Sequence, residues 1–158
     1  MATQPSADHP VTEFAGQLFF RLWRATHTRT AEMLASVGLT PALFALLNVI
    51  GAREGAIQQE LGTVLGIDRS TMVSLIDQLE SVGLAARRPS ATDRRAREIA
   101  ITANGRRLLQ RARRLISQVE DEVLAGLTDD ERRDLLTLLR RTLDSAPAQP
   151  LWSSEEGD

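Results

Sequence analysis

Apolar residues recur every three to four positions at both ends of the chain, which is the spacing of helices that bury one face. The first such pattern covers residues 11–37, and a second one covers residues 102–127. A capping box formed by Thr128 and Glu131 then indicates the start of a last helix, over residues 128–143. The pattern therefore predicts long helices on both sides of a central region.

Shorter patterns separated by turn residues fill that central region. Thr40 and Pro41 form an N-cap and a first-turn proline, which predict the start of a helix. Two short helices are predicted next, over residues 57–65 and 69–82. The turn between them begins with Gly66, which suits the left-handed backbone that ends a helix. This spacing is typical of a helix-turn-helix.

A small β-hairpin is predicted directly after the helix-turn-helix. Residues 84–88 and 97–102 have the pattern of two short strands around a polar loop. In the second strand, Ile99 and Ile101 alternate with polar or small residues, as a strand with one covered face requires. The predicted fold class is therefore mostly α with a small β wing, a winged helix-turn-helix over residues 40–102 that is flanked by helices.

The flanking helices carry more apolar residues than a winged helix of this size can cover. We expect residues 10–37 and 103–145 to be N- and C-terminal dimerisation helices, which bury one another across a two-fold axis. An intramolecular helix bundle is the alternative. Residues 1–9 and 146–158 are polar or interrupted by proline, and we expect a disordered N-terminus and an acidic flexible tail.

Charge is distributed unevenly along the chain, although the formal net charge is only −2. Residues 87–114 contain ten arginines and two acidic residues, whereas residues 115–158 contain four arginines and eleven acidic residues. Because salt limits the effect of an exposed charge to about 10 Å, an acidic protein with one basic segment can still bind a polyanion. The basic segment includes the predicted hairpin, so double-stranded DNA is the predicted partner.

The second helix of a helix-turn-helix enters the major groove and offers side chains to the base edges. Five residues in the first turns of helix 69–82 lie on or beside its outward face: Arg69, Ser70, Thr71, Val73 and Ser74. We expect Ser70, Thr71 and Ser74 to face the bases, and Val73 suits contact with a thymine methyl group. The alternative is an ordinary solvated helix face.

A hairpin beyond the recognition helix reaches the neighbouring minor groove, whose negative potential favours inserted arginines. The hairpin carries five arginines within eleven residues: Arg87, Arg88, Arg94, Arg95 and Arg97. Charges also protect an exposed strand edge from aggregation, but this density exceeds what edge protection requires. We therefore expect these side chains to contact phosphates or the minor groove.

The segment GLAARRPSATDRRAREIAITANGRRLL resembles the wing signature of MarR-type (multiple-antibiotic-resistance) regulators. The segments LTPALFALLNVI and QQELGTVLGIDRSTMVSLIDQLESVGL match the preceding parts of the same family, so the resemblance covers about residues 11–143. It implies a homodimeric repressor with intertwined terminal helices, acting on a pseudo-palindromic operator. It also implies that Arg95 at the wing tip enters the minor groove, where Asp93 holds it by a charge-assisted hydrogen bond.

One departure from the family pattern concerns the recognition helix. Members often carry arginine or lysine at the positions that Ser74 and Gln78 occupy here. We therefore expect affinity to come mainly from the wing and from Arg69, with modest base readout.

The resemblance also implies a pocket between the first helices and the DNA-binding region for a small aromatic or phenolic effector. Trp23 and His27 lie one turn apart on the first helix, with Arg24 beside them. An aromatic ring and a cationic group suit such a ligand. The alternative is that Trp23 packs in the core and that His27 is hydrogen-bonded there.

Several other classes of protein are disfavoured by composition. The chain has no cysteine, which excludes disulfides, thiolate metal sites and thiol-based peroxide sensing, and it has two histidines and no tyrosine. We expect no enzyme activity, no cofactor and no metal. The apolar stretch 41–52 is too short to span a bilayer and the N-terminus lacks the features of a secretory signal, so we expect a soluble cytoplasmic protein. A winged-helix protein-interaction module is the remaining alternative to a DNA-binding regulator.

Overall fold

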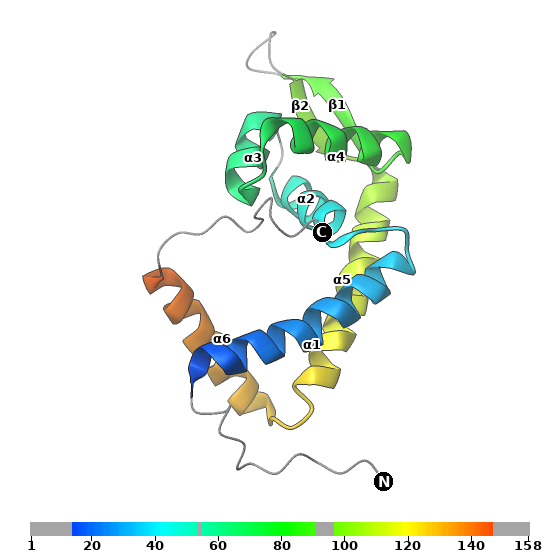
Figure 1. The fold of residues 1–158 in the computed structure, drawn as a ribbon. Coiled ribbons are helices and arrows are strands. Elements are labelled where there is room, and N and C mark those ends of the chain that lie inside the picture. The colour runs from blue at the N-terminus through cyan, green and yellow to red at the C-terminus, as the bar shows by residue number, and fades with distance from the viewer. Residues whose placement is uncertain (1–13, 54, 91–96, 147–158) are drawn as a thin grey trace.

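The computed structural model describes residues 14–53, 55–90 and 97–146. Six helices and one two-stranded hairpin make up this part of the chain (Figure 1): α1 (Ala15–Ala35), α2 (Pro41–Ala52), α3 (Gln58–Leu65), α4 (Arg69–Ser81), β1 (Ala85–Pro89), β2 (Arg97–Ile101), α5 (Ala103–Val123) and α6 (Asp129–Ser145). We call α2 to α4 with the hairpin the winged lobe, and α1, α6 and the second half of α5 the helical arms. The predicted fold class, mostly α with a small β wing, is confirmed.

Local capping explains where the helices of the winged lobe begin and end. The Thr40 side chain accepts a hydrogen bond from the Leu43 amide at 3.2 Å, and Pro41 follows as the first helical residue of α2. Gly66, with φ of 67°, ends α3 in the left-handed conformation that glycine adopts without strain. Both features are as the sequence predicts.

The hairpin is antiparallel, and its register pairs Ala85 with Ile101 and Arg87 with Ile99. Ile99 and Ile101 are buried, so one face of the hairpin covers the core. The Ile99 amide also donates a hydrogen bond to the Ala56 carbonyl at 2.9 Å, which fastens β2 to the segment that leads into α3. The wing is therefore anchored to the helix-turn-helix.

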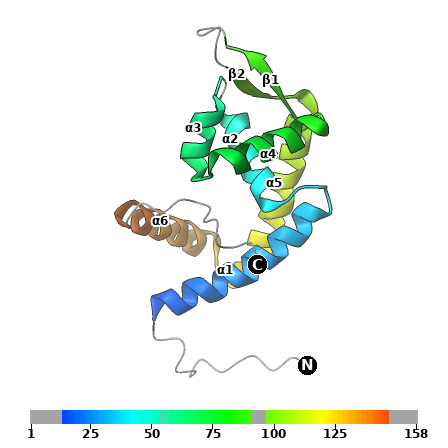
Figure 2. The ribbon, with the colours of Figure 1, turned by 45° about the horizontal axis from the view of Figure 1, so that its top comes forward.

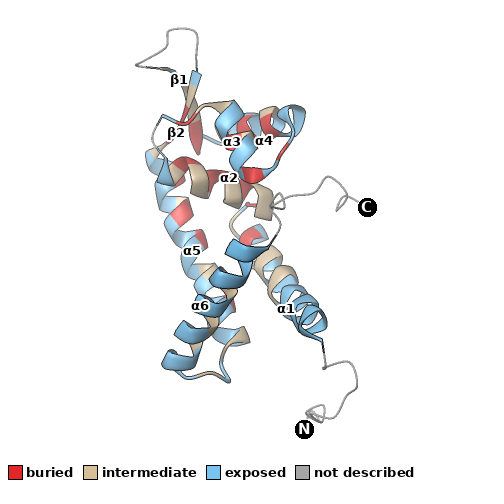
Figure 3. Ribbon diagram, turned by 90° about the vertical axis from the view of Figure 1, so that its left-hand side faces the viewer, coloured by how far each residue is buried: buried red, intermediate tan, exposed pale blue. Residues whose placement is uncertain are grey.

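The core of the molecule lies in the winged lobe, where buried residues gather between α2, α3, α4 and the hairpin (Figure 3). Leu34 at the end of α1 joins its most buried members, which within the lobe are apolar: Leu46, Leu47, Ile50, Leu61, Leu65, Met72, Ile76, Leu79 and Ile99. The first half of α5 joins this core at a close approach, because a Cβ at Gly105 would lie 2.1 Å from the Leu84 carbonyl oxygen. Only glycine fits at that position.

The helical arms bury far less. In Figures 1 and 2, α6 stands away from the winged lobe, and none of its residues is buried. Leu143 on α6 is 73% exposed, and Phe14 before α1 is 65% exposed. Helix α1 packs along α5, where Arg29 forms an ion pair with Glu122 at 3.5 Å. The arms thus present apolar side chains that one chain does not cover.

Within the described residues, no helix is both long enough and apolar enough to cross a membrane.

Candidate nucleic-acid interface

The outward face of α4 carries the residues that the sequence assigns to base recognition. Four apolar side chains of α4 are buried on its inner face: Met72, Leu75, Ile76 and Leu79. Of the predicted recognition residues, four are exposed and one is half-buried: Arg69, Ser70, Thr71 and Ser74 are exposed, and Val73 is half-buried. The first turns of α4 are therefore free to enter a groove, as a recognition helix requires.

The N-terminus of α4 is capped by Asp68. Its carboxylate accepts hydrogen bonds from the amides of Ser70 and Thr71, at 2.8 and 3.0 Å, and from the Ser70 hydroxyl. These bonds from Ser70 and Thr71 hold the pKa of Asp68 well below its usual range. Because the cap uses the Ser70 hydroxyl proton, the Ser70 oxygen is left to accept a hydrogen bond from a base.

The middle of the outward face of α4 is uncharged. The Gln78 side-chain amide donates a hydrogen bond to the Ser74 hydroxyl oxygen at 3.3 Å, and both residues are exposed. These are the two positions at which the family that the sequence resembles often has a cation. Helix α4 therefore contributes hydrogen-bonding groups here, and the positive charge must come from elsewhere.

Positive charge comes from the wing. Arg97 is the first residue of β2 and Arg88 lies on β1, and both are exposed. Asp93, Arg94 and Arg95, which the sequence places at the wing tip, lie outside the described residues.

Arg87 differs from Arg88 and Arg97, because it is half-buried and faces α4. It forms ion pairs with Asp77 and Glu80 of α4. Partial burial opposes its charge, but the hydrogen bond that it donates to Asp77 and the charges of Glu80 and Asp77 raise the pKa of Arg87 overall. The sequence predicts Arg87 as a DNA contact, whereas the structure shows its guanidinium engaged within the protein.

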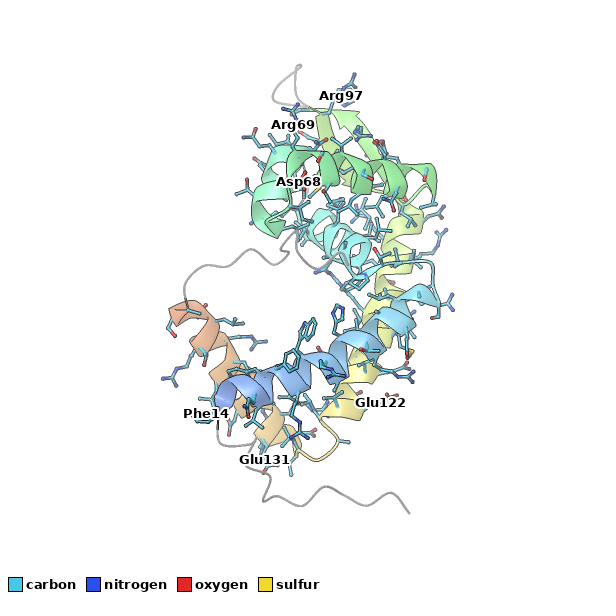
Figure 4. The ribbon with its side chains drawn as sticks, in the orientation of Figure 1. Phe14, Asp68, Arg69, Arg97, Glu122 and Glu131 are labelled. Atoms are coloured by element: carbon cyan, nitrogen blue, oxygen red, sulfur yellow. The ribbon has the colours of Figure 1, made fainter. Side chains whose placement is uncertain are left out.

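A groove of about 910 Å³ lies where α3, α4 and the wing meet. Arg69, from the start of α4, and Arg97, from the start of β2, both line it, and Figure 4 shows these two labelled side chains on the same side of the winged lobe. The two cations are 28 residues apart in sequence, and the fold brings them to one concave surface. Asp68 lines the groove too, with its carboxylate bonded to the Ser70 and Thr71 amides, so two cations face one anion and the net positive charge suits a phosphate backbone.

Three polar residues of this groove were missed by sequence reasoning. Gln58, Gln59 and Thr63 of α3 line it together with the two arginines. Amide and hydroxyl side chains are common phosphate contacts in protein–DNA complexes. The available signal was that polar residues begin helix α3, whose apolar residues Leu61 and Leu65 are buried.

The residues predicted for an effector form an aromatic row along α1. The Trp23 ring stacks on the His27 ring with centroids 4.8 Å apart, and the Phe20 ring stacks on Trp23 at 6.1 Å. Arg24 places its guanidinium carbon 6.0 Å from the centre of the Phe20 ring. Trp23 is 45% exposed and so is not part of the core of a single chain, while His27 is half-buried.

Comparison with known proteins decides the family. The family model for the MarR family matches residues 37–96. A protein of Thauera aromatica, assigned as a transcriptional regulatory protein for the hcr operon, is 35% identical over 131 residues, which cover 80% of this chain and 79% of that protein. The chain belongs to the MarR family. The family resemblance seen in the sequence is confirmed, and with it the class of DNA-binding transcriptional regulator, which is not a class of enzymes.

Solved structures show the MarR-family fold in two bound states. CouR bound to a 23-mer DNA duplex matches with a TM-score of 0.73 and 35% identity, over 82% of this chain and 92% of that one. CouR from Rhodococcus jostii RHA1 bound to p-coumaroyl-CoA matches with a TM-score of 0.73 and 25% identity, over 88% of this chain and 98% of that one.

Proposed function

We propose that this MarR-family chain is a homodimeric repressor that acts in the cytoplasm on a pseudo-palindromic operator and is released by an aromatic effector. It has no catalytic role. The observation that carries the DNA-binding part is the groove in which Arg69 and Arg97 converge with the polar side chains of α3. A phosphate backbone lying along this groove would bring the outward face of α4 to the major groove.

The proposed base contacts are those that the fold leaves exposed on the first turns of α4. Ser70, Thr71 and Ser74 offer hydroxyl groups to the base edges, and Val73 lies beside them. As the family resemblance implies, Arg94 and Arg95 with Asp93 would reach the adjacent minor groove.

Dimerisation is supported by the helical arms. Helix α6 buries no residue within one chain, and Leu136, Leu138 and Leu143 are all exposed on it. The first half of α1 is exposed as well, including Phe19, and so is Phe14 just before it. A second copy that covers these faces would hold two α4 helices about one DNA turn apart, as a palindromic site requires.

The effector is proposed to be an aromatic acid or its coenzyme A thioester. Support comes from the stacked Phe20, Trp23 and His27 rings and from the match to CouR with p-coumaroyl-CoA. Release of DNA would follow if the ligand preferred a dimer whose α4 helices have the wrong spacing.

A salt titration tests DNA binding. A duplex selected from a random library is titrated by fluorescence anisotropy between 50 and 200 mM salt, about the range over which multiple phosphate contacts lose several powers of ten in affinity. We expect the logarithm of the affinity to fall linearly with the logarithm of salt. Binding that barely depends on salt, or no selected sequence at all, would favour the protein-interaction alternative.

Removing charge from the groove tests whether the groove is where DNA binds. Changing Arg69 and Arg97 together to glutamine should lower the affinity for all duplexes about 100-fold and reduce the salt slope by about two. Arg133→Gln is the matched control, because Arg133 lies on α6 with its side chain 73% exposed and outside the winged lobe. Equal losses in the two proteins would show that the groove has no special part in binding.

A further inference from the structure

Arg87 lies between the wing and the recognition helix. Its Nη1 is 2.7 Å from the Asp77 Oδ1 and also contacts the Glu80 carboxylate. The Arg87 and Glu80 side chains are each only 29% exposed, whereas Asp77 is 57% exposed. One guanidinium is thus shared between two carboxylates of the same helix, three residues apart.

The main chain takes part in the same contact. The Arg87 amide donates a hydrogen bond to Glu80 Oε1 at 2.7 Å. Glu80 therefore holds strand β1 through both the backbone and the side chain of Arg87. This contact joins α4 directly to the wing, close to the point where the two strands enter the core.

Strand geometry explains why Arg87 points toward α4 and its neighbour does not. Side chains alternate between the two faces of a strand, and Arg87 pairs with the buried Ile99 while Arg88 pairs with the half-buried Glu98. Arg87 therefore shares the covered face, and Arg88 the outer face. The two adjacent arginines have different surroundings although the sequence makes them look equivalent.

The carboxylates that Arg87 binds are unfavourable for DNA binding. Helix α4 contains one cation, Arg69, and two anions, Asp77 and Glu80. If α4 enters the major groove, these carboxylates approach phosphates of like charge, which costs binding free energy. Arg87 supplies the charge that offsets them.

We propose that Arg87 is a positioning residue, which promotes DNA binding by neutralising Asp77 and Glu80 on α4 and by fixing the wing to that helix, without touching the phosphates itself. This inference rests on the proposed DNA-binding function. It separates Arg87 from Arg88, Arg94, Arg95 and Arg97, which the sequence groups with it as direct contacts.

A double-mutant cycle distinguishes this indirect role from a direct phosphate contact. Arg87→Met, which keeps the length of the side chain and removes its charge, should weaken operator binding about tenfold in the natural background. The same change in a chain that carries Asp77→Asn and Glu80→Gln should weaken binding less than about twofold, because nothing is left to neutralise.

A direct phosphate contact by Arg87 would give a different result in this cycle. If Arg87 contacts phosphate, Arg87→Met costs the same or more in the neutral background, since the guanidinium is freed there to reach DNA. Additive or larger losses would overturn the proposal. Arg88→Met provides the control, because its loss should be the same in both backgrounds. Thermal unfolding of each variant shows whether a loss of binding reflects a loss of fold.

A second experiment examines the contact in the DNA-free protein. Glu80→Ala should speed hydrogen exchange at the Arg87 amide about tenfold, because the hydrogen bond of that amide is lost. Asp77→Ala is the matched control and should leave this amide unchanged, since Asp77 does not accept its hydrogen bond. Unchanged exchange in Glu80→Ala would disprove the link between α4 and the wing. If the natural protein binds no duplex, the proposed function itself fails, whatever the exchange shows.

Discussion

The winged lobe and the helical arms have similar apolar patterns in the sequence, but they differ in how far one chain buries the apolar side chains. In the lobe, Leu46, Leu47 and Ile76 are completely buried within one chain. In the arms, Leu143 is 73% exposed and α6 buries nothing. Equal periodicity in the sequence therefore does not mean equal burial in the chain. Under the proposed function, the lobe would present α4 to DNA by itself, whereas the arms would need a partner before they could set the spacing of two lobes.

The largest expected effect comes from the arms. Changing Leu136 and Leu143 to glutamate should place charge in the face that a second copy covers, and should weaken dimerisation about 100-fold or more. Sedimentation analysis measures the dimer, and anisotropy measures the loss of operator binding that follows. Thr137→Glu is the control, because it adds one negative charge at an exposed position about 100° around α6 from Leu136. A double variant that stays dimeric would mean that α6 is not in the interface.

In the winged lobe, loss of an apolar side chain should affect the stability of the fold. Leu46→Ala removes a fully buried side chain and should lower the free energy of unfolding by about 2–5 kcal/mol. Urea denaturation at fixed protein concentration measures this loss. Val82→Ala, at a position in the same lobe that is 64% exposed, should change stability by less than about 0.5 kcal/mol. Similar losses in both variants would contradict the location of the core.

Much of this contrast, but not all of it, could be predicted from the sequence. The caps at Thr40, Asp68 and Thr128 are local, because each hydrogen bond lies within three residues of the cap. The helix-turn-helix and hairpin follow from such signals. Helix α5 ends at Val123 and not near Leu127, because the apolar pattern continues through a turn that precedes the next cap.

In the candidate DNA interface, contacts between distant elements could not be predicted from the sequence. That α4 exposes its first turns follows from periodicity, but the meeting of Arg69 with Arg97 requires the hairpin to fold back beside α3. The partners of Arg87 lie seven and ten residues before it, on another element. Strand alternation assigns Arg87 to the covered face, yet only packing shows which helix covers it.

A smaller effect tests how the arms communicate with the lobe. Titration with p-coumaroyl-CoA should lower operator affinity, and Trp23→Ala should raise the ligand concentration required about tenfold, because an aromatic stacking surface is lost. Val82→Ala removes an exposed apolar side chain from the winged lobe, outside α1 and its aromatic row, and should leave ligand binding unchanged. Equal effects of the two variants would place the ligand elsewhere. No effect of the ligand on the natural protein would exclude this thioester as the effector.

The smallest effect compares one cap in each region. The pKa of Asp68 in the folded protein lies below the value of about 3.9 for an unperturbed aspartate. Its contribution to stability is therefore complete above about pH 4 and is lost as pH falls toward the folded pKa. Asp68→Ala should lower the Tm by a few degrees at neutral pH, and the difference from the natural protein should shrink steadily below pH 4. A difference that stays constant with pH would contradict a charged cap.

Glu131 is the third residue of α6 and completes the capping box of Thr128, whose amide and hydroxyl donate hydrogen bonds to the Glu131 carboxylate and lower the pKa of Glu131. The loss of stability in Glu131→Ala should also shrink as the pH falls. The reason is again that a carboxylate whose pKa is lower in the folded protein stabilises it above the pKa of the unfolded chain. The two caps should differ in another respect. Since α6 is proposed to pack only on a second copy, the Tm loss in Glu131→Ala should vary with protein concentration, whereas the loss in Asp68→Ala should not. Thermal unfolding over a hundredfold range of concentration measures both, and equal concentration dependence would remove the distinction between the lobe and the arms.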